Sequence, residues 1–295
     1  MPDAPESGLS IVVPVFNEEG GIAGTVEALL ELSGSIEAPL ELVFVNDGSM
    51  DGTRAILDGF GDRIEVFHHN RNRGYGAALK TGIARARFDH VAICDADGTY
   101  PIDRIPDLYQ RCAAERRDMV VGARTGTNVT YSKLRRIPKW FLRRYINWIA
   151  RDDIPDFNSG LRVFRREVAL KYAAILPDGF SFTTTITLAL KCNRYDVAYV
   201  PIDYFERTGS SHIKPFRDTL RFVQLIARTG MYFAPLRILG PLIPATGLLF
   251  LASLGYDIAI EGNLGDKSVL LMVLFFNVTL FAALADMISR LREIR

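Results

Sequence analysis

The chain has few of the residues that build disulfide frameworks or transition-metal sites. Its 295 residues include three cysteines, Cys94, Cys112 and Cys192, an odd number without metal-type spacing. We therefore expect reduced thiols within a core, in a reducing compartment. Residues 1–9 also lack the basic and apolar regions of a signal peptide, so we expect the large N-terminal part to stay in the cytosol. The net charge of +1 favours no class of partner by itself.

Charge is almost absent from two long stretches near the C-terminus. Residues 236–260 and 268–288 are long and apolar enough to cross a hydrocarbon core of about 30 Å as helices. The alternative is a buried helical hairpin inside a soluble core. Basic residues flank the outer ends of both stretches, which predicts that both termini face the cytoplasm. These residues are Arg221, Arg228, Arg237, Arg290, Arg292 and Arg295.

Residues 1–214 show the alternation of strands and helices that is typical of a doubly wound α/β domain. Short β-branched runs predict strands at 10–15, 40–46, 64–67, 90–95 and 119–122. Helical patterns at 21–32, 53–60, 76–87 and 102–117 separate them. We therefore expect a Rossmann-like, mostly parallel sheet, which binds ligands at the carboxyl ends of its strands.

Two further segments are amphipathic. Residues 131–151 contain many basic residues, no acid and two tryptophans, which predicts a helix lying on a membrane surface. A solvated helix face is the alternative, and nucleic-acid binding is a weaker third reading because nothing else in the chain supports it. Residues 215–235 predict an interfacial helix that leads into the first apolar stretch, and 290–295 would form a short cytosolic tail.

Polar side chains follow three of the predicted strands. They are Asn17 with Glu18, Asn46 with Asp47, and Asp95 with Asp97. Asp95 and Asp97 stand two residues apart, so both carboxylates can face one side and hold Mg²⁺ or Mn²⁺. The alternatives are a solvated acidic turn for this pair and a helix-capping turn for residues 45–53.

Four segments carry a family resemblance when they are taken in order. Residues 14–18, 45–53, 72–80 and 95–97 together resemble family 2 glycosyltransferases with a GT-A fold, and the likeness runs from Ser10 to about Lys214. Residues 121–124, 156–162 and 207–212 resemble the branch of dolichyl-phosphate mannose synthases and bacterial polyprenyl-phosphate glucosyltransferases. Processive polysaccharide synthases are less similar, because their Gln-x-x-Arg-Trp signature is absent.

This resemblance implies a nucleotide-sugar donor site. Asp47 would contact the base or ribose, Asp95 the nucleotide, and Asp97 would be the principal metal ligand. The sequence departs from the pattern at Asn46, where many relatives have aspartate, and at His212, where lysine is common. The remaining donor-side candidates are Pro14, Val15, Asn17, Glu18, Lys80, Arg207, Ser211 and His212, with Arg207 and His212 placed toward the diphosphate.

The resemblance further implies inverting transfer of a hexose from a UDP- or GDP-sugar to a polyprenyl phosphate. Arg124, Arg135 and Arg136 would hold the acceptor phosphate, which is already an anion and needs no strong base. Asp156 would act as base, orient the sugar or anchor an arginine.

Other functions remain open from the sequence. They are transfer to another membrane glycolipid, an inactive nucleotide-sugar-binding scaffold and a small channel subunit. The resemblance also implies homo-oligomers formed through the apolar helices, where Gly240, Gly247 and Gly255 permit close approach.

Overall fold

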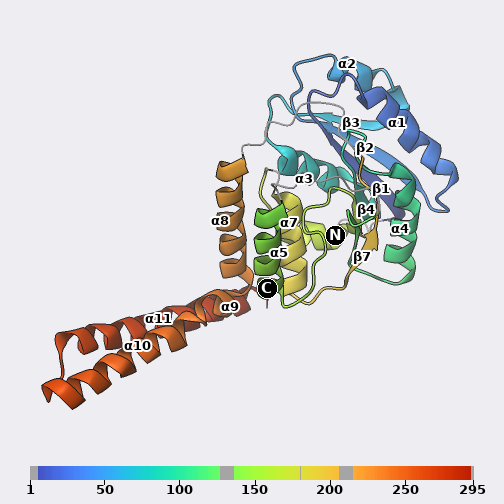
Figure 1. Ribbon diagram of the computed structural model, residues 1–295. Coiled ribbons are helices and arrows are strands. Elements are labelled where there is room, and N and C mark those ends of the chain that lie inside the picture. Colours follow the sequence, from blue (N-terminus) through green and yellow to red (C-terminus); the bar gives the residue numbers. More distant parts are fainter. Residues whose placement is uncertain (1–5, 127–135, 180, 206–214, 294–295) are drawn as a thin grey trace.

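A single mixed sheet forms the centre of the N-terminal domain. The computed structural model describes residues 6–126, 136–179, 181–205 and 215–293 (Figure 1). The strands are β1 (Glu6–Val15), β2 (Leu40–Asn46), β3 (Glu65–His68), β4 (Phe88–Ile93), β5 (Met119–Ala123), β6 (Arg162–Arg165) and β7 (Val197–Pro201). Their order is β3-β2-β1-β4-β6-β5-β7, and β6 alone runs antiparallel to its neighbours β4 and β5. The expected α/β fold with a mostly parallel sheet is confirmed.

Helices cover both faces of the sheet. On one face lie α1 (Ile22–Glu31), α2 (Thr53–Asp58) and α4 (Ile105–Ala114); on the other lie α3 (Tyr75–Arg85), α6 (Arg166–Tyr172) and α7 (Phe182–Cys192). Because side chains alternate along a strand, Ile11 and Val13 of β1 pack with the first group while Val12 packs with the second. The arrangement leaves the carboxyl ends of β1, β2 and β4 at one edge, where the predicted polar residues lie.

Two long helices pack beside this domain. In Figure 1, α5 (Arg136–Ala150) and α8 (Pro215–Phe233) stand next to α7. Ile146 and Ile149 of α5, Leu188 of α7 and Ile226 of α8 share a third hydrophobic cluster. Trp148 of α5 remains 44% exposed. The helices expected to lie on a membrane surface therefore each bury one face against the domain.

The C-terminal hairpin extends away from the domain (Figure 1). It contains α9 (Pro235–Leu239), α10 (Leu242–Tyr256), a π-helical turn (Asp257–Glu261) and α11 (Asp266–Glu293). Two stretches, Pro235–Glu261 and Asp266–Leu291, are long and apolar enough to cross a membrane, with mean hydropathies of 1.8 and 2.3. Within an apolar 18-residue window of each stretch only 6% and 11% is buried, whereas the core helices of a soluble protein are mostly buried.

Contacts within the chain close the hairpin. At its tip, the buried Asp257 carboxylate accepts a hydrogen bond of 2.8 Å from the Gly265 amide. Gly247 allows the close approach of α10 and α11, since a Cβ there would lie 3.2 Å from the Phe275 ring. Gly247 thus serves packing inside one chain.

Candidate active site

Asp95 and Asp97 lie just beyond the end of β4. The Asp95 carboxylate accepts a hydrogen bond of 2.8 Å from the Tyr75 hydroxyl, and the Asp97 carboxylate accepts one of 2.6 Å from the Thr99 hydroxyl. The chain also passes very close to Asp95 at Gly160, where a Cβ would stand 2.5 Å from Oδ2. Each carboxylate is therefore positioned by a hydroxyl, and Gly160 leaves the space that Asp95 occupies.

Tyr75 was not expected from the sequence as a site residue. It is the first residue of α3, and its neighbour Gly74 has the positive φ of 106° that lets the chain turn there. Burial and the Asp95 carboxylate raise the pKa of Tyr75 well above its usual value. The phenol consequently stays protonated and donates to Asp95 at any physiological pH.

The carboxylates fit a hard divalent cation. Among the described residues no three histidine, cysteine or acidic side chains cluster as a metal site, and Asp95 and Asp97 are the ligands that the sequence predicts. Two carboxylates are what Mg²⁺ or Mn²⁺ uses when water and substrate phosphates supply the remaining oxygens.

The end of β2 is held by an extended set of hydrogen bonds. Asp47 is 3% exposed, and its carboxylate accepts hydrogen bonds from the His69 ring at 2.6 Å and from the Arg73 and Gly74 amides at 2.9 and 2.7 Å. Asp47 therefore holds the segment between β3 and α3.

The loop after β1 is bound to the loop after β2. The Ser49 hydroxyl accepts from the Asn17 amide at 2.9 Å, and the Asn17 side chain accepts from the Met50 amide at 2.8 Å. The Glu18 amide donates to the Thr53 hydroxyl at the start of α2. Two predicted donor segments thus form one surface at the sheet edge. Pro14 and Val15 are buried in β1 beneath it.

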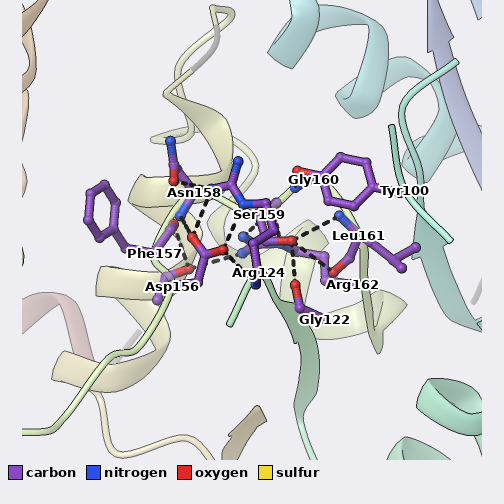
Figure 2. Close-up of polar contacts among 11 residues, drawn as sticks. Tyr100, Gly122, Arg124, Asp156, Phe157, Asn158, Ser159, Gly160, Leu161 and Arg162 are labelled. Carbon is purple, nitrogen blue, oxygen red and sulfur yellow. Dashed lines mark hydrogen bonds and ion pairs between the residues drawn. The ribbon is translucent and has the colours of Figure 1, made fainter. Parts of the chain in front are cut away.

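Arg124 directly follows β5, and Asp156 lies in the segment between α5 and β6. Figure 2 shows the Arg124 guanidinium directed at Asp156, with Nε and Nη2 at 2.7 and 2.9 Å from the two oxygens. Nη2 also donates to Asn158, and the guanidinium stacks over the Tyr204 ring. The Arg124 and Asp156 side chains are only 10% and 3% exposed, so this ion pair is largely buried. Of the roles predicted for Asp156, the structure displays that of arginine anchor.

A second arginine lies beneath this loop. Arg162 is fully buried, and its guanidinium donates to the Ser159 carbonyl oxygen (Figure 2). It also donates to the Thr183 carbonyl oxygen and the Thr187 hydroxyl. Burial lowers the pKa of this guanidinium, while nearby groups that include Asp156 oppose the shift. Arg162 fixes the turn that carries Gly160 toward Asp95.

Several predicted site residues are placed differently or are not described. Lys80 forms an ion pair with Asp178 and donates to the Leu176 carbonyl, which directs it at a neighbouring loop. Arg136 begins α5, but its side chain is not described. Four candidates, Arg135, Arg207, Ser211 and His212, lie outside the described residues.

Comparison with known proteins identifies the family to which this chain belongs. Residues 10–172 match glycosyl transferase family 2, which is more than half of the chain. The chain therefore belongs to this family and is a glycosyltransferase. It resembles a dodecaprenyl-phosphate galacturonate synthase of Rhizobium johnstonii, with 28% identity over 96% of this chain and 88% of the relative. It also resembles a bactoprenol glucosyl transferase of Shigella phage SfV, with 29% identity over 90% and 87%.

Two further similarities extend this picture. The low-salt glycan biosynthesis hexosyltransferase Agl6 of Haloferax volcanii is 27% identical over 87% of this chain, which spans 58% of that relative's length. Among solved structures, a glucosyl-3-phosphoglycerate synthase from Mycobacterium tuberculosis, in complex with Mn²⁺, UDP-glucose and phosphoglyceric acid, superposes with a TM-score of 0.59. It covers 76% of this chain and 80% of that chain at 17% identity, which shows the shared GT-A-type fold.

Proposed function

We propose that this enzyme transfers a hexose from a UDP- or GDP-sugar to a polyprenyl phosphate, with inversion at the anomeric carbon. The observation that carries the proposal is that one domain holds Asp95 and Asp97 after β4 and the Arg124–Asp156 ion pair after β5, and leads into two apolar helices. Relatives that act on dodecaprenyl phosphate and bactoprenol support the lipid acceptor.

On the donor side, the loops after β1 and β2 would bind the nucleoside. Asp97, with Asp95, would hold Mg²⁺ or Mn²⁺, and the structure of the Mycobacterium tuberculosis synthase, which contains Mn²⁺, supports this choice. The cation would neutralise charge on the diphosphate as it leaves. Tyr75 and Thr99 would keep both carboxylates in place as the donor binds.

On the acceptor side, Arg124 would receive the lipid phosphate. Arginine presents a planar set of donors that suits phosphate oxygens, and Asp156 orients that set. Because the phosphate is already an anion, its oxygen can attack the anomeric carbon without a protein base. Asp156 would therefore position Arg124.

The hairpin and the long helices would bring this site to the lipid. The two apolar helices would span the membrane with both termini in the cytoplasm, and α8 would run along the interface before them. The Arg144, Tyr145, Asn147 and Trp148 side chains line an open hollow on the surface of α5, where the Tyr145 and Trp148 rings stack. Such a surface suits lipid headgroups.

Comparing acceptors tests this proposal. We would assay transfer from UDP-glucose and GDP-mannose to undecaprenyl phosphate and, in parallel, to undecaprenol, which has the same chain with a neutral hydroxyl. Transfer to the phosphate alone is expected. Equal transfer to the alcohol, or transfer only to a glycolipid hydroxyl, would contradict the polyprenyl phosphate acceptor. A neutral hydroxyl acceptor would also require a catalytic base.

A further inference from the structure

Two adjacent histidines, His68 and His69, contact the residues at the end of β2. His68 ends β3 opposite Asn46 of β2, and His69 follows it. The Asn46 amide nitrogen lies 3.1 Å from Nδ1 of His68, and the Asp47 carboxylate lies 2.6 Å from Nδ1 of His69. Asn46 thus contacts the His68 ring, and Asp47 contacts the His69 ring.

The hydrogen bonds determine which nitrogen carries the proton on His68. The Asn46 side-chain oxygen accepts from the Ser49 amide at 3.0 Å, so its NH₂ group must face His68. Nδ1 of His68 therefore accepts, and the proton of the neutral ring lies on Nε2. From there it is donated to the Asp58 carboxylate at 2.8 Å.

His69 requires the opposite tautomer. An ionised carboxylate can only accept, so Nδ1 of His69 carries the proton that binds Asp47. Its Nε2 lies 2.9 Å from the Thr81 hydroxyl, which can donate to it. The same Asp47 carboxylate accepts from the Arg73 and Gly74 amides, so His69 also fixes the segment before α3.

We infer that His68 and His69 are positioning residues for the nucleoside half of the donor site, and that they act as opposite tautomers. His68 orients the Asn46 side-chain amide. His69 positions the Asp47 carboxylate and, through it, residues 71–74. This inference rests on the proposed function, because it assumes that the end of β2 faces a nucleotide. Neither histidine is thereby a catalytic residue.

Matched substitutions separate positioning from simple space filling. The amide of asparagine replaces Nδ1 of histidine, whereas the amide of glutamine extends to the place of Nε2. For His69 we expect His69→Asn to keep nucleoside diphosphate affinity within about threefold of the wild type. His69→Gln and His69→Ala should each weaken it about tenfold. If volume alone mattered, glutamine, the larger residue, would be the better replacement.

The experiment has two readouts that do not depend on one another. UDP and GDP binding to the full chain in detergent gives the affinities, and amide hydrogen exchange of residues 71–75 reports the positioned segment without any ligand. His69→Gln should speed that exchange while His69→Asn preserves it. If His69→Gln protects these amides from exchange as well as His69→Asn does, or better, the inference is overturned. If the wild-type chain binds neither nucleotide, the proposed donor fails while the exchange data still decide the positioning role.

The tautomers can be observed in the unaltered protein. The chain has four histidines, so ¹⁵N-histidine labelling with two-bond ¹⁵N–¹H spectra gives few signals. Protonated Nε2 on His68 and protonated Nδ1 on His69 are expected at pH 8. The same tautomer on both rings would contradict the inference.

Discussion

The Arg124 guanidinium and the Asp156 carboxylate form a two-pronged ion pair, and the Arg124 amide donates to the same carboxylate at 3.0 Å. Removing one charge from a buried pair leaves the other uncompensated. We therefore expect Asp156→Asn to lower the free energy of unfolding by about 3 kcal/mol. Asp153→Asn is the control, because its pair with Arg143 is exposed and contributes less than about 1 kcal/mol. Equal losses in thermal unfolding would contradict this difference.

The same substitution separates positioning from base catalysis. If Asp156 holds Arg124, Asp156→Asn should raise the KM for the lipid phosphate more than it lowers kcat, and Arg124→Lys should do likewise since lysine cannot form the paired contact. Steady-state kinetics over a range of lipid concentrations measures both. A collapse of kcat with unchanged KM in Asp156→Asn alone would instead identify a base.

Tyr75 offers a test of the carboxylate pair. Tyr75→Phe removes the hydrogen bond to Asp95 and should weaken metal-dependent donor binding about tenfold. Because the pKa of Tyr75 is raised, the wild-type enzyme should show no loss between pH 7 and 9 from this phenol. Tyr109→Phe is the control, since that ring packs edge-on against His90 in another part of the domain. Donor binding by calorimetry that is unchanged in Tyr75→Phe would count against the role.

Lys80 should act on a loop and not on the diphosphate. Its partners are Asp178 and the Leu176 carbonyl, and Asp178 is largely exposed. We expect Lys80→Ala to leave the Kd for UDP within about twofold and to cost less than about 1 kcal/mol of stability. A loss of UDP affinity greater than tenfold in titration would show that Lys80 turns to the donor.

Membrane topology can be tested with paired cysteine substitutions. Asn263 is exposed at the tip of the hairpin, and Glu37 is exposed on the α/β domain. If the hairpin spans the membrane as proposed, Asn263→Cys should react with an impermeant maleimide in intact cells and Glu37→Cys only after lysis. Labelling of both sites, or of neither, in intact cells would contradict the topology.

The sequence predicted the part of the fold that has strong local signals. The strand at residues 40–46 matches β2, and the acidic residues expected at strand ends lie there. It did not reveal β6, which is short and contains the buried Arg162, a residue that composition alone would place at the surface. Helix α7 was also missed, because its run of threonines is β-branched and favours strands until tertiary burial overrides that preference.

The site was predictable only where one segment carries the signal. The spacing of Asp95 and Asp97 indicated a pair, but Tyr75 joins it from a segment 20 residues earlier. The contacts of His69 with Asp47 and of Arg124 with Asp156 likewise join distant segments. A single histidine or arginine in a sequence gives no sign of such a partner, since the fold brings them together.

Metal-dependent sugar transfer to the lipid tests the central claim most directly. We would incubate the full chain in detergent with undecaprenyl or dolichyl phosphate, radiolabelled UDP- and GDP-sugars and Mg²⁺ or Mn²⁺, beside Asp97→Ala. A labelled lipid that requires the cation and is absent with Asp97→Ala is the expected result. If no donor yields a labelled lipid although nucleotide binds to the wild-type chain, the enzyme does not use a polyprenyl phosphate acceptor.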